Sequence, residues 1–308
     1  MYHRFIKYSI YLLIMFIICG CEKIINIPLE EAPEVTIVDA WINDKYELQV
    51  IKIKQSLPYF EDNALPGVKG AEVRVIKENG DQFGFIESEI TDGEYIWIPP
   101  GDSVNIGQVG DRFVLDVKIN GFQIGSFSEM RRAPDIDSID FRLASDNPIL
   151  KGSYLAQFYA SDFIGTGDTY WIKAYKNGEF LSKPSEINIA FDAGLSRGDH
   201  VDGVSFNKFI RTGVNPYDQN DNGDIISPYM LGDSLYVEIH SLTNLAYSYL
   251  FEVSVQTNRP GGITELLAVP LANVPTNIVN VTNDEPVTGF FSVSAVKSMG
   301  KRFLEEEE

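Results

Sequence analysis

The chain has 308 residues and a formal net charge of −19, with 44% hydrophobic and 12% aromatic residues. This apolar content excludes a disordered chain, and the length allows two domains of ordinary size. The acidic surface would repel phosphate backbones, which argues against nucleic acid as a partner, although such a charge also serves solubility alone.

Residues 1–20 have the pattern of a secretory signal peptide. Arg4 and Lys7 precede an apolar run at 8–18. At about 1.5 Å per residue this run is too short to cross the ~30 Å hydrocarbon core of a bilayer. The run leads into the tetrapeptide ICGC at 18–21, which holds both cysteines of the chain. We therefore expect the leader to be removed.

The ICGC tetrapeptide resembles the bacterial lipoprotein box, in which an aliphatic residue and two small residues precede a cysteine. In that class of signal, the last cysteine receives a diacylglyceryl thioether and the chain is cut before it. The resemblance implies lipid attachment at Cys21 and cleavage after Gly20. The alternative, a disulfide between Cys19 and Cys21, would be strained. A thioether-linked anchor with two or three acyl chains would hold the protein stably at a membrane.

The tether at 21–33 is followed by a series of predicted strands. Their apolar and polar residues alternate over 34–42, 46–54, 70–86, 93–98 and 111–127. In the last run Phe113, Leu115, Val117 and Ile119 face inward, and Arg112, Asp116 and Lys118 face outward. Asn-Gly pairs at 79–80 and 120–121 predict hairpin turns. About seven strands predict an immunoglobulin-like or fibronectin-like β-sandwich domain at 34–130.

A second β-rich domain is predicted at 145–304, after a boundary between 130 and 145 that contains Pro134. Its strands are expected at 154–160, 169–181, 234–242 and 289–299, with a long loop region at 192–232. One helix is expected near 243–257, capped by Thr243 or Asn244 and stopped by the Pro-Gly-Gly at 260–262. The fold class is therefore mainly all-β, with two consecutive β-sandwich domains.

Few residues offer catalytic chemistry. After the leader, the histidines are His200, in a loop, and His240, whose alternating strand favours a place on a sheet face. No nucleophile elbow, zinc-binding helix motif or phosphate-binding loop occurs in the sequence. We therefore expect a protein that is not an enzyme. A glycan or peptide hydrolase that uses pairs of acids is the alternative, since sequence spacing does not show which acids meet.

One motif has the spacing of a calcium loop. Asp218, Asn220 and Asn222 occupy its first, third and fifth positions, and a glycine occupies the sixth. The twelfth position, which should be a bidentate Glu, is Tyr229, so Asp224 would have to supply a ligand in a different geometry. Without such a ligand, the segment is an Asn/Asp/Gly turn cluster. Calcium is the one cofactor that the sequence suggests.

Aromatic side chains near glycine-rich loops are the candidates for ligand binding, because aromatic faces stack on sugars or peptides. They are Trp171, Tyr175, Phe206, Phe209, Tyr217 and Tyr229, of which Tyr217, Tyr229 and Phe206 are the binding candidates. Filling of the domain cores is the alternative role for most of these rings. The loop region 192–232 is where contacts with a sugar or peptide ligand are expected.

Several stretches together resemble a known family. They are Cys21-Glu22-Lys23, Val38-Asp39-Ala40-Trp41-Ile42, Gln55-Ser56-Leu57-Pro58-Tyr59-Phe60, Val68-Lys69-Gly70-Ala71-Glu72-Val73, Asp137-Ser138-Ile139, Gly232-Asp233-Ser234-Leu235-Tyr236-Val237, Pro275-Thr276-Asn277-Ile278 and Gly289-Phe290-Phe291. The chain is similar in these to the Bacteroidota lipoproteins known as domain of unknown function 4249. The resemblance implies an outer-membrane lipoprotein encoded near TonB-dependent receptors, and it implies no catalytic or binding residues.

The sequence thus predicts an outer-membrane lipoprotein that acts as a non-catalytic binding or accessory subunit beside a TonB-dependent transporter. Only one acid, Glu22, directly follows Cys21, so the leaflet, periplasmic or surface, stays open. The alternative from another class is a structural or adhesive lipoprotein of the cell envelope without a small ligand.

Overall fold

The computed structural model describes residues 33–58, 61, 63–101, 104–144, 153–216, 227–259 and 270–304. The described residues are mainly β, with 45% strand and 9% helix, which confirms the predicted all-β class. Glu34–Glu308 forms one unit, and its larger sheet has nine strands in the order β14-β7-β6-β3-β4-β5-β2-β1-β15. They are β1 (Thr36–Asn43), β2 (Gln49–Gln55), β3 (Glu72–Lys77), β4 (Gln82–Glu87), β5 (Glu94–Trp97), β6 (Arg112–Ile119), β7 (Phe122–Glu129), β14 (Val279–Asn280) and β15 (Val287–Ser294).

The alternation in β6 fixes which face of this first sheet is buried. Phe113, Leu115 and Val117 are fully buried, as the period-2 pattern predicts. Asp116 was expected to face solvent, but it is only 7% exposed. It accepts a hydrogen bond from the guanidinium of Arg74 at 2.6 Å on the neighbouring strand β3, and this ion pair explains why a carboxylate is tolerated there.

Asn-Gly turns join the predicted hairpins, although not all of them in the same way. Asn120 and Gly121 both have positive φ, at 49° and 85°, so the β6–β7 turn is of the mirror-image type. At the Asn79-Gly80 pair only the glycine has positive φ. The hydrogen bond from the Lys77 amide to the Asp81 carbonyl then closes a wider turn between β3 and β4.

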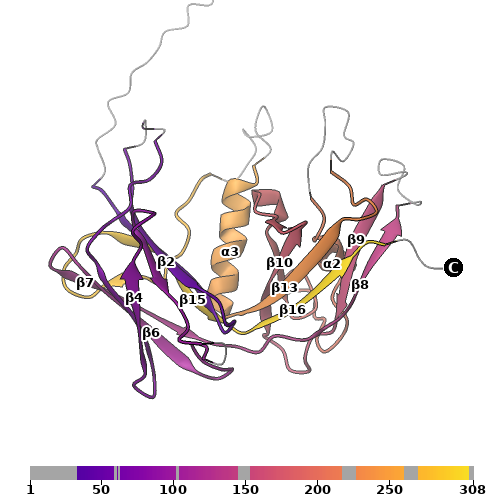
Figure 1. The fold of residues 1–308 in the computed structure, drawn as a ribbon, viewed down its shortest axis with the longest axis horizontal. Helices are drawn as coiled ribbons and strands as arrows, with labels where there is room; N and C mark the ends of the chain where they lie inside the picture. Colours follow the sequence, from indigo (N-terminus) through magenta and orange to yellow (C-terminus); the bar gives the residue numbers. More distant parts are fainter. Residues whose placement is uncertain are drawn as a thin grey trace, which may run out of the picture. The chain divides into compact units, whose positions relative to one another are not determined.

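The first sheet is completed by strands from the end of the chain. β15 pairs in parallel with β1 along its whole length, from Thr36 with Val287 to Asn43 with Ser294. On its other side, the Val293 amide donates to the hydroxyl of Ser128 in β7 at 3.0 Å. The sheet therefore curls until its two ends meet, and it is not formed from the predicted range 34–130 alone (Figure 1).

The second sheet has the order β11-β10-β13-β16, with β12 also paired to β10. The remaining elements are β8 (Ile136–Leu143), β9 (Tyr154–Ala160), β10 (Thr169–Lys176), β11 (Glu179–Phe180), η1 (Pro184–Glu186), β12 (Asn188–Phe191), α2 (Lys208–Thr212), β13 (Ser234–Leu242), α3 (Asn244–Thr257) and β16 (Val296–Arg302). β8 and β9 pair with each other, and β8 occupies half of the predicted boundary at 130–145. The predicted loop region 192–232 contains α2, which begins at the cap residue Asn207.

Helix α3 lies between the two sheets in Figure 1. Its predicted cap is correct, because the Thr243 hydroxyl accepts from the Ala246 amide at 3.2 Å. Ala246 and Leu250 are buried in a small core with Phe290 of β15 and Ile189 of β12. α3 therefore fixes the outer face of the first sheet to the second sheet. No helix in the described part of the chain is long and apolar enough to cross a bilayer.

Candidate functional site

Three hollows lie next to one another, and the middle one lies where the two sheets and α3 meet. The first, of about 240 Å³, lies on the outer face of β1 and β2. The second, of about 260 Å³, lies between Trp41 of β1, Trp171 of β10 and the helix α3. The third, of about 390 Å³, lies beyond β11. The first two share Trp41 as a wall, and the last two share Phe180, Leu181, Ser182 and Glu186. We call this row of hollows the groove.

The middle of the groove is aromatic. Trp41 stacks on Phe290 with ring centroids 5.5 Å apart, and its other contacts are an edge contact with Trp171 at 5.2 Å and a tilted contact with Tyr249 at 5.9 Å. Phe180 adds an edge contact to Trp171 at 6.5 Å and is 39% exposed. Such ring pairs each add about 0.5–1.5 kcal/mol beyond area burial, so the wall is held rigidly.

Beside this aromatic cluster, the face of β10 and β13 carries a network of ionisable groups. Glu238 is 3% exposed and accepts hydrogen bonds from the Lys45 ammonium at 2.5 Å and the Tyr175 hydroxyl at 3.2 Å. Its second oxygen also lies 2.9 Å from Nε2 of His240, which is 4% exposed. Since Lys45 lies in the β1–β2 turn, the network joins that turn to the second sheet.

Burial and pairing shift the pKa values of this network in definite directions. Burial alone would raise the pKa of Glu238, but hydrogen bonds from His240 and Lys45 outweigh it and leave the pKa well below its usual range. Burial lowers the pKa of His240 to about 4, so its imidazole is neutral near pH 7. A neutral ring that donates from Nε2 to the Glu238 carboxylate is therefore the form that this geometry favours.

Lys173 and Asp39 lie on opposite strands, β10 and β1, next to the same aromatic cluster. The Lys173 ammonium lies 4.2 Å from the ring centroid of Trp171, and burial lowers its pKa to about 8. Asp39 lines the first hollow. Desolvation raises the pKa of its carboxyl group, although the positive charge of Lys52 acts in the opposite direction. The groove thus offers both signs of charge close to apolar rings.

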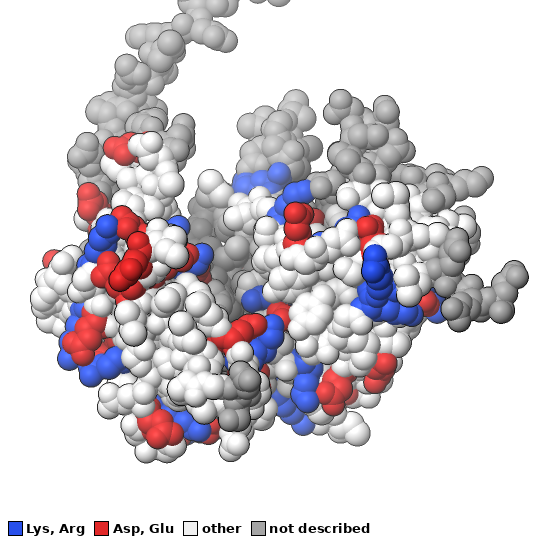
Figure 2. Space-filling model, viewed as in Figure 1, with Lys and Arg blue, Asp and Glu red and all other residues white. Residues whose placement is uncertain are grey.

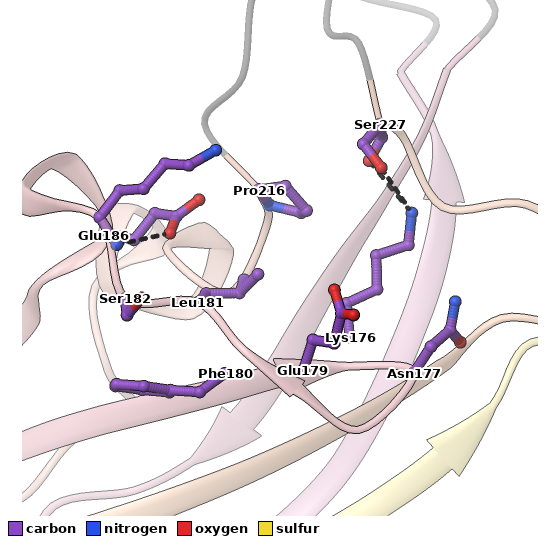
Figure 3. A pocket seen from close by; sticks show the side chains of 10 residues that line it. Lys176, Asn177, Glu179, Phe180, Leu181, Ser182, Glu186, Pro216 and Ser227 are labelled. Atoms are coloured by element: carbon purple, nitrogen blue, oxygen red, sulfur yellow. Dashed lines mark hydrogen bonds between the residues drawn. The ribbon is translucent and has the colours of Figure 1, made fainter.

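The third hollow is the most polar part of the groove (Figure 3). The Lys176 ammonium extends across it to the Ser227 hydroxyl at 3.2 Å and to the Asp233 carboxylate at 3.2 Å. On the opposite side Glu186 accepts from the Lys183 amide at 2.9 Å, next to Leu181 and Pro216. Pro216 and Ser227 both belong to the predicted loop region 192–232.

The structure separates the sequence-predicted binding residues. Phe206 and Tyr229 are 2% and 1% exposed, and the Tyr229 hydroxyl donates to the Val214 carbonyl at 3.1 Å. Both rings fill the core, so a ligand at the surface does not reach them. Trp171 lines the groove, whereas Phe209, 72% exposed, lies on α2 outside its walls. Tyr217 lies outside the described residues.

The predicted calcium ligands Asp218, Asn220, Asn222 and Asp224 also lie outside the described residues, as does the lipid-attachment residue Cys21. Among the described residues one other set of carboxylates comes together. Asp162, Asp192 and Asp202 each place an oxygen within 4.8 Å of the others. Asp162 accepts from the Tyr170 hydroxyl at 2.6 Å, and Asp192 accepts from the Gly167 amide at 2.7 Å. These bonds hold the loop after β9 against β12.

Sequence reasoning did not find most of the groove. Trp41, Lys173, Glu238 and Tyr249 come from four different elements, and no spacing in the sequence connects them. A usable signal did exist in β10, where Trp171, Lys173 and Tyr175 share one face and interrupt an otherwise apolar strand. Aromatic and charged residues together on the less buried face of an alternating strand indicate a second, partly open surface.

The surface around these elements mixes charges of both signs. On the face in Figure 2, acidic and basic side chains alternate and no large patch of one sign covers it.

No curated protein matches the sequence. The family described as "Domain of unknown function (DUF4249)" matches residues 22–299, which is nearly the whole chain. The chain belongs to this domain-of-unknown-function family.

Proposed function

We propose that this protein is a non-catalytic binding or accessory subunit of the cell envelope, held to lipid through Cys21. In this proposal it acts beside a TonB-dependent transporter in nutrient uptake. The observation that carries the proposal is the groove, whose three hollows of about 240, 260 and 390 Å³ share walls. A row of concave sites with an aromatic centre and charged ends suits ligand binding.

The use of the ionisable groups supports binding rather than chemistry. Glu238, Lys45, His240 and Tyr175 are tied to one another by hydrogen bonds. Donation of a proton from one of these groups to a substrate would break a hydrogen bond within the network. The groups therefore hold the neighbouring groove walls in position. The low pKa of His240 also makes its imidazole a weaker base than an ordinary histidine.

The membrane and transporter parts of the proposal rest on the leader sequence, the ICGC tetrapeptide and the family resemblance. An adhesive or structural role would need no concave site with an aromatic centre, so the groove favours a ligand. The experiment is affinity purification of the tagged full-length protein from detergent-solubilised outer membranes. Recovery of a TonB-dependent receptor in near-equal amount is expected, and recovery of envelope polymer alone would contradict the proposal.

A matched pair of variants connects the groove to that result. Trp171→Ala removes an aromatic wall, whereas Phe127→Ala removes an exposed ring from the outer face of β7, away from the groove. If the accessory role depends on a ligand in the groove, Trp171→Ala lowers ligand-dependent uptake in cells and Phe127→Ala does not. Equal uptake in both variants would show that the groove is not the working site.

A further inference from the structure

The backbone beside the groove offers an unpaired strand edge. β11 is the end strand of the second sheet, and the register pairs Tyr175 with Phe180 and Lys176 with Glu179. The turn between them, Asn177-Gly178, has positive φ at both residues, as the Asn-Gly hairpin signal predicts. In such a hairpin the residues next to the turn form the hydrogen-bonded pair, and the following pair is not hydrogen-bonded.

This alternation fixes where the backbone of Phe180 points. The Leu181 amide donates to the Ala174 carbonyl at 2.9 Å, which marks the next hydrogen-bonded pair of the ladder. The N–H and C=O of Phe180 therefore point away from β10, towards the free edge. Neither group bonds to another described residue. Five consecutive residues, 179–183, line the third hollow, so this edge runs along its wall.

The hollow next to this edge fits a hydrocarbon side chain. Beside Trp41, Trp171 and Tyr249 its walls include the aliphatic side chains of Leu250 and Val253 from α3, and Ser182 and Glu186 are the polar residues of its lining. A sugar placed there would bury hydroxyl groups against aliphatic walls, and each unpaired hydroxyl would cost free energy. An apolar or aromatic side chain gains free energy in the same place.

We propose that the ligand of the groove is an extended peptide that pairs with the free edge of β11 and inserts an apolar side chain into the hollow that Trp41, Trp171 and Tyr249 line. Main-chain hydrogen bonds to Phe180 give affinity, and the aromatic hollow selects the side chain, which is the logic of strand addition to a sheet edge. This inference rests on the proposed function, because it names the ligand class of that same site.

Tryptophan fluorescence reports on the groove directly. The chain has three tryptophans, and Trp97 lies in the first sheet against Phe83, away from the groove. In a Trp97→Phe background the signal comes from Trp41 and Trp171. Titration of the full-length protein in detergent with acetyl-Gly-Gly-Phe-Gly-Gly-amide is expected to give a saturable change, and the Asp analogue is expected to bind at least tenfold more weakly.

Two further comparisons test the geometry. N-methylation of single peptide amides is expected to weaken binding at least tenfold at one position only, because the Phe180 carbonyl accepts from one peptide amide and the neighbouring amides of a strand face the other way. Val253→Phe fills the aromatic hollow and is expected to weaken binding at least tenfold. Val255→Phe, at an exposed position of the same helix, is the matched control and stays within twofold of the parent.

The outcomes separate the ligand class from the function. Binding of maltohexaose instead of peptides, lost in Val253→Phe, would overturn the peptide class and leave the groove as a ligand site. Peptide binding that is indifferent to N-methylation would overturn pairing with β11. A flat fluorescence signal with both probes, together with uptake unchanged by Trp171→Ala, would overturn the inference and the proposed function together.

Discussion

The ammonium of Lys45 and the carboxylate of Glu238, 193 positions apart in the sequence, form an ion pair at 2.5 Å. The pair joins the β1–β2 turn to β13, and so it crosses from the first sheet to the second. Glu238 is nearly fully buried, whereas 27% of the Lys45 side chain is exposed. The pair therefore adds a charged contact to the apolar packing that holds β1 and β2 beside the second sheet.

Loss of this cation should destabilise the protein. Lys45→Met leaves the buried Glu238 carboxylate without its ammonium partner, and we expect the free energy of unfolding to fall by about 3 kcal/mol. Lys52→Met breaks a pair with Glu94 whose side chains are 44% and 24% exposed, so we expect a loss below about 1 kcal/mol. Urea denaturation of both variants measures the difference, and equal losses would contradict the structural role of Lys45.

Acid should weaken the same network through His240. Its folded pKa of about 4 lies below the ordinary value of 6.5, so the unfolded chain takes up the proton first as pH falls. Stability should therefore decrease between pH 6.5 and 4, and the lowered pKa of Glu238 extends the loss to lower pH.

The measurement is urea denaturation at pH 7, 5.5 and 4.5. His240→Gln retains an N–H donor for Glu238 but does not titrate, so it should flatten this part of the pH profile. His200→Gln, at an exposed loop position, serves as control and should retain the full slope. A parent protein that is equally stable at pH 7 and 4.5 would show that His240 is not buried as a neutral ring.

Gly289 permits the parallel pairing of β15 with β1. Its φ is +111°, and a Cβ there would lie 1.9 Å from the Val38 carbonyl oxygen. Gly289→Ala should cost about 3 kcal/mol or more, because strain and overlap act together. Gly84→Ala, where a Cβ meets nothing within 4 Å, should change stability by less than about 1 kcal/mol. Thermal unfolding compares the two, and similar melting temperatures would disprove the close approach.

Lipidation predicts a difference between the two cysteines. Cys21→Ala should abolish incorporation of a clickable palmitate analogue in growing cells and release the protein from membranes, whereas Cys19→Ala should keep both. The reason is that the thioether forms on the last cysteine of the box. Gel fluorescence after labelling measures the outcome, and equal labelling of Cys21→Ala and the parent would remove the lipoprotein hypothesis.

Calcium binding by the 218–224 segment stays a prediction. Isothermal titration with calcium should show heat that is lost in Asp218→Asn combined with Asp224→Asn, because these are the charged ligands that the motif offers. Asp202→Asn is the control, since it alters the separate carboxylate cluster with Asp162 and Asp192. No heat at millimolar calcium in the parent protein would reject the segment as a site.

Local pattern was sufficient to predict most of the strands. In 111–127 the alternation and the Asn-Gly pair are contained in one hairpin, so β6, its buried residues and its turn followed from the sequence. The parallel pairing of β1 with β15 did not, because it joins segments about 250 positions apart and leaves no local signature. Asp116 was misplaced for the same reason, since its partner Arg74 lies on another hairpin.

The candidate site was less accessible to sequence reasoning than the fold. An aromatic residue in the sequence is as compatible with a place in the core as with a place in the wall of a ligand site. Phe206, which is in the core, and Trp171, which lines the groove, could therefore not be told apart. The short helix α2 was missed although Asn207 caps it and Gly213 ends it, because five residues show no helical period.

The pairing of β1 with β15 also determines the order in which the strands of the first sheet pair during folding. The hairpins β1–β2, β3–β4 and β6–β7 join segments that are close in the sequence, but β1 keeps a bare edge until β15, which begins at Val287, has reached it. Contacts between distant segments form slowly, and bare strand edges invite association with other chains. A molecule in which β15 has not yet paired therefore exposes the edge of β1 to other chains, and a holding chaperone would protect it during this interval.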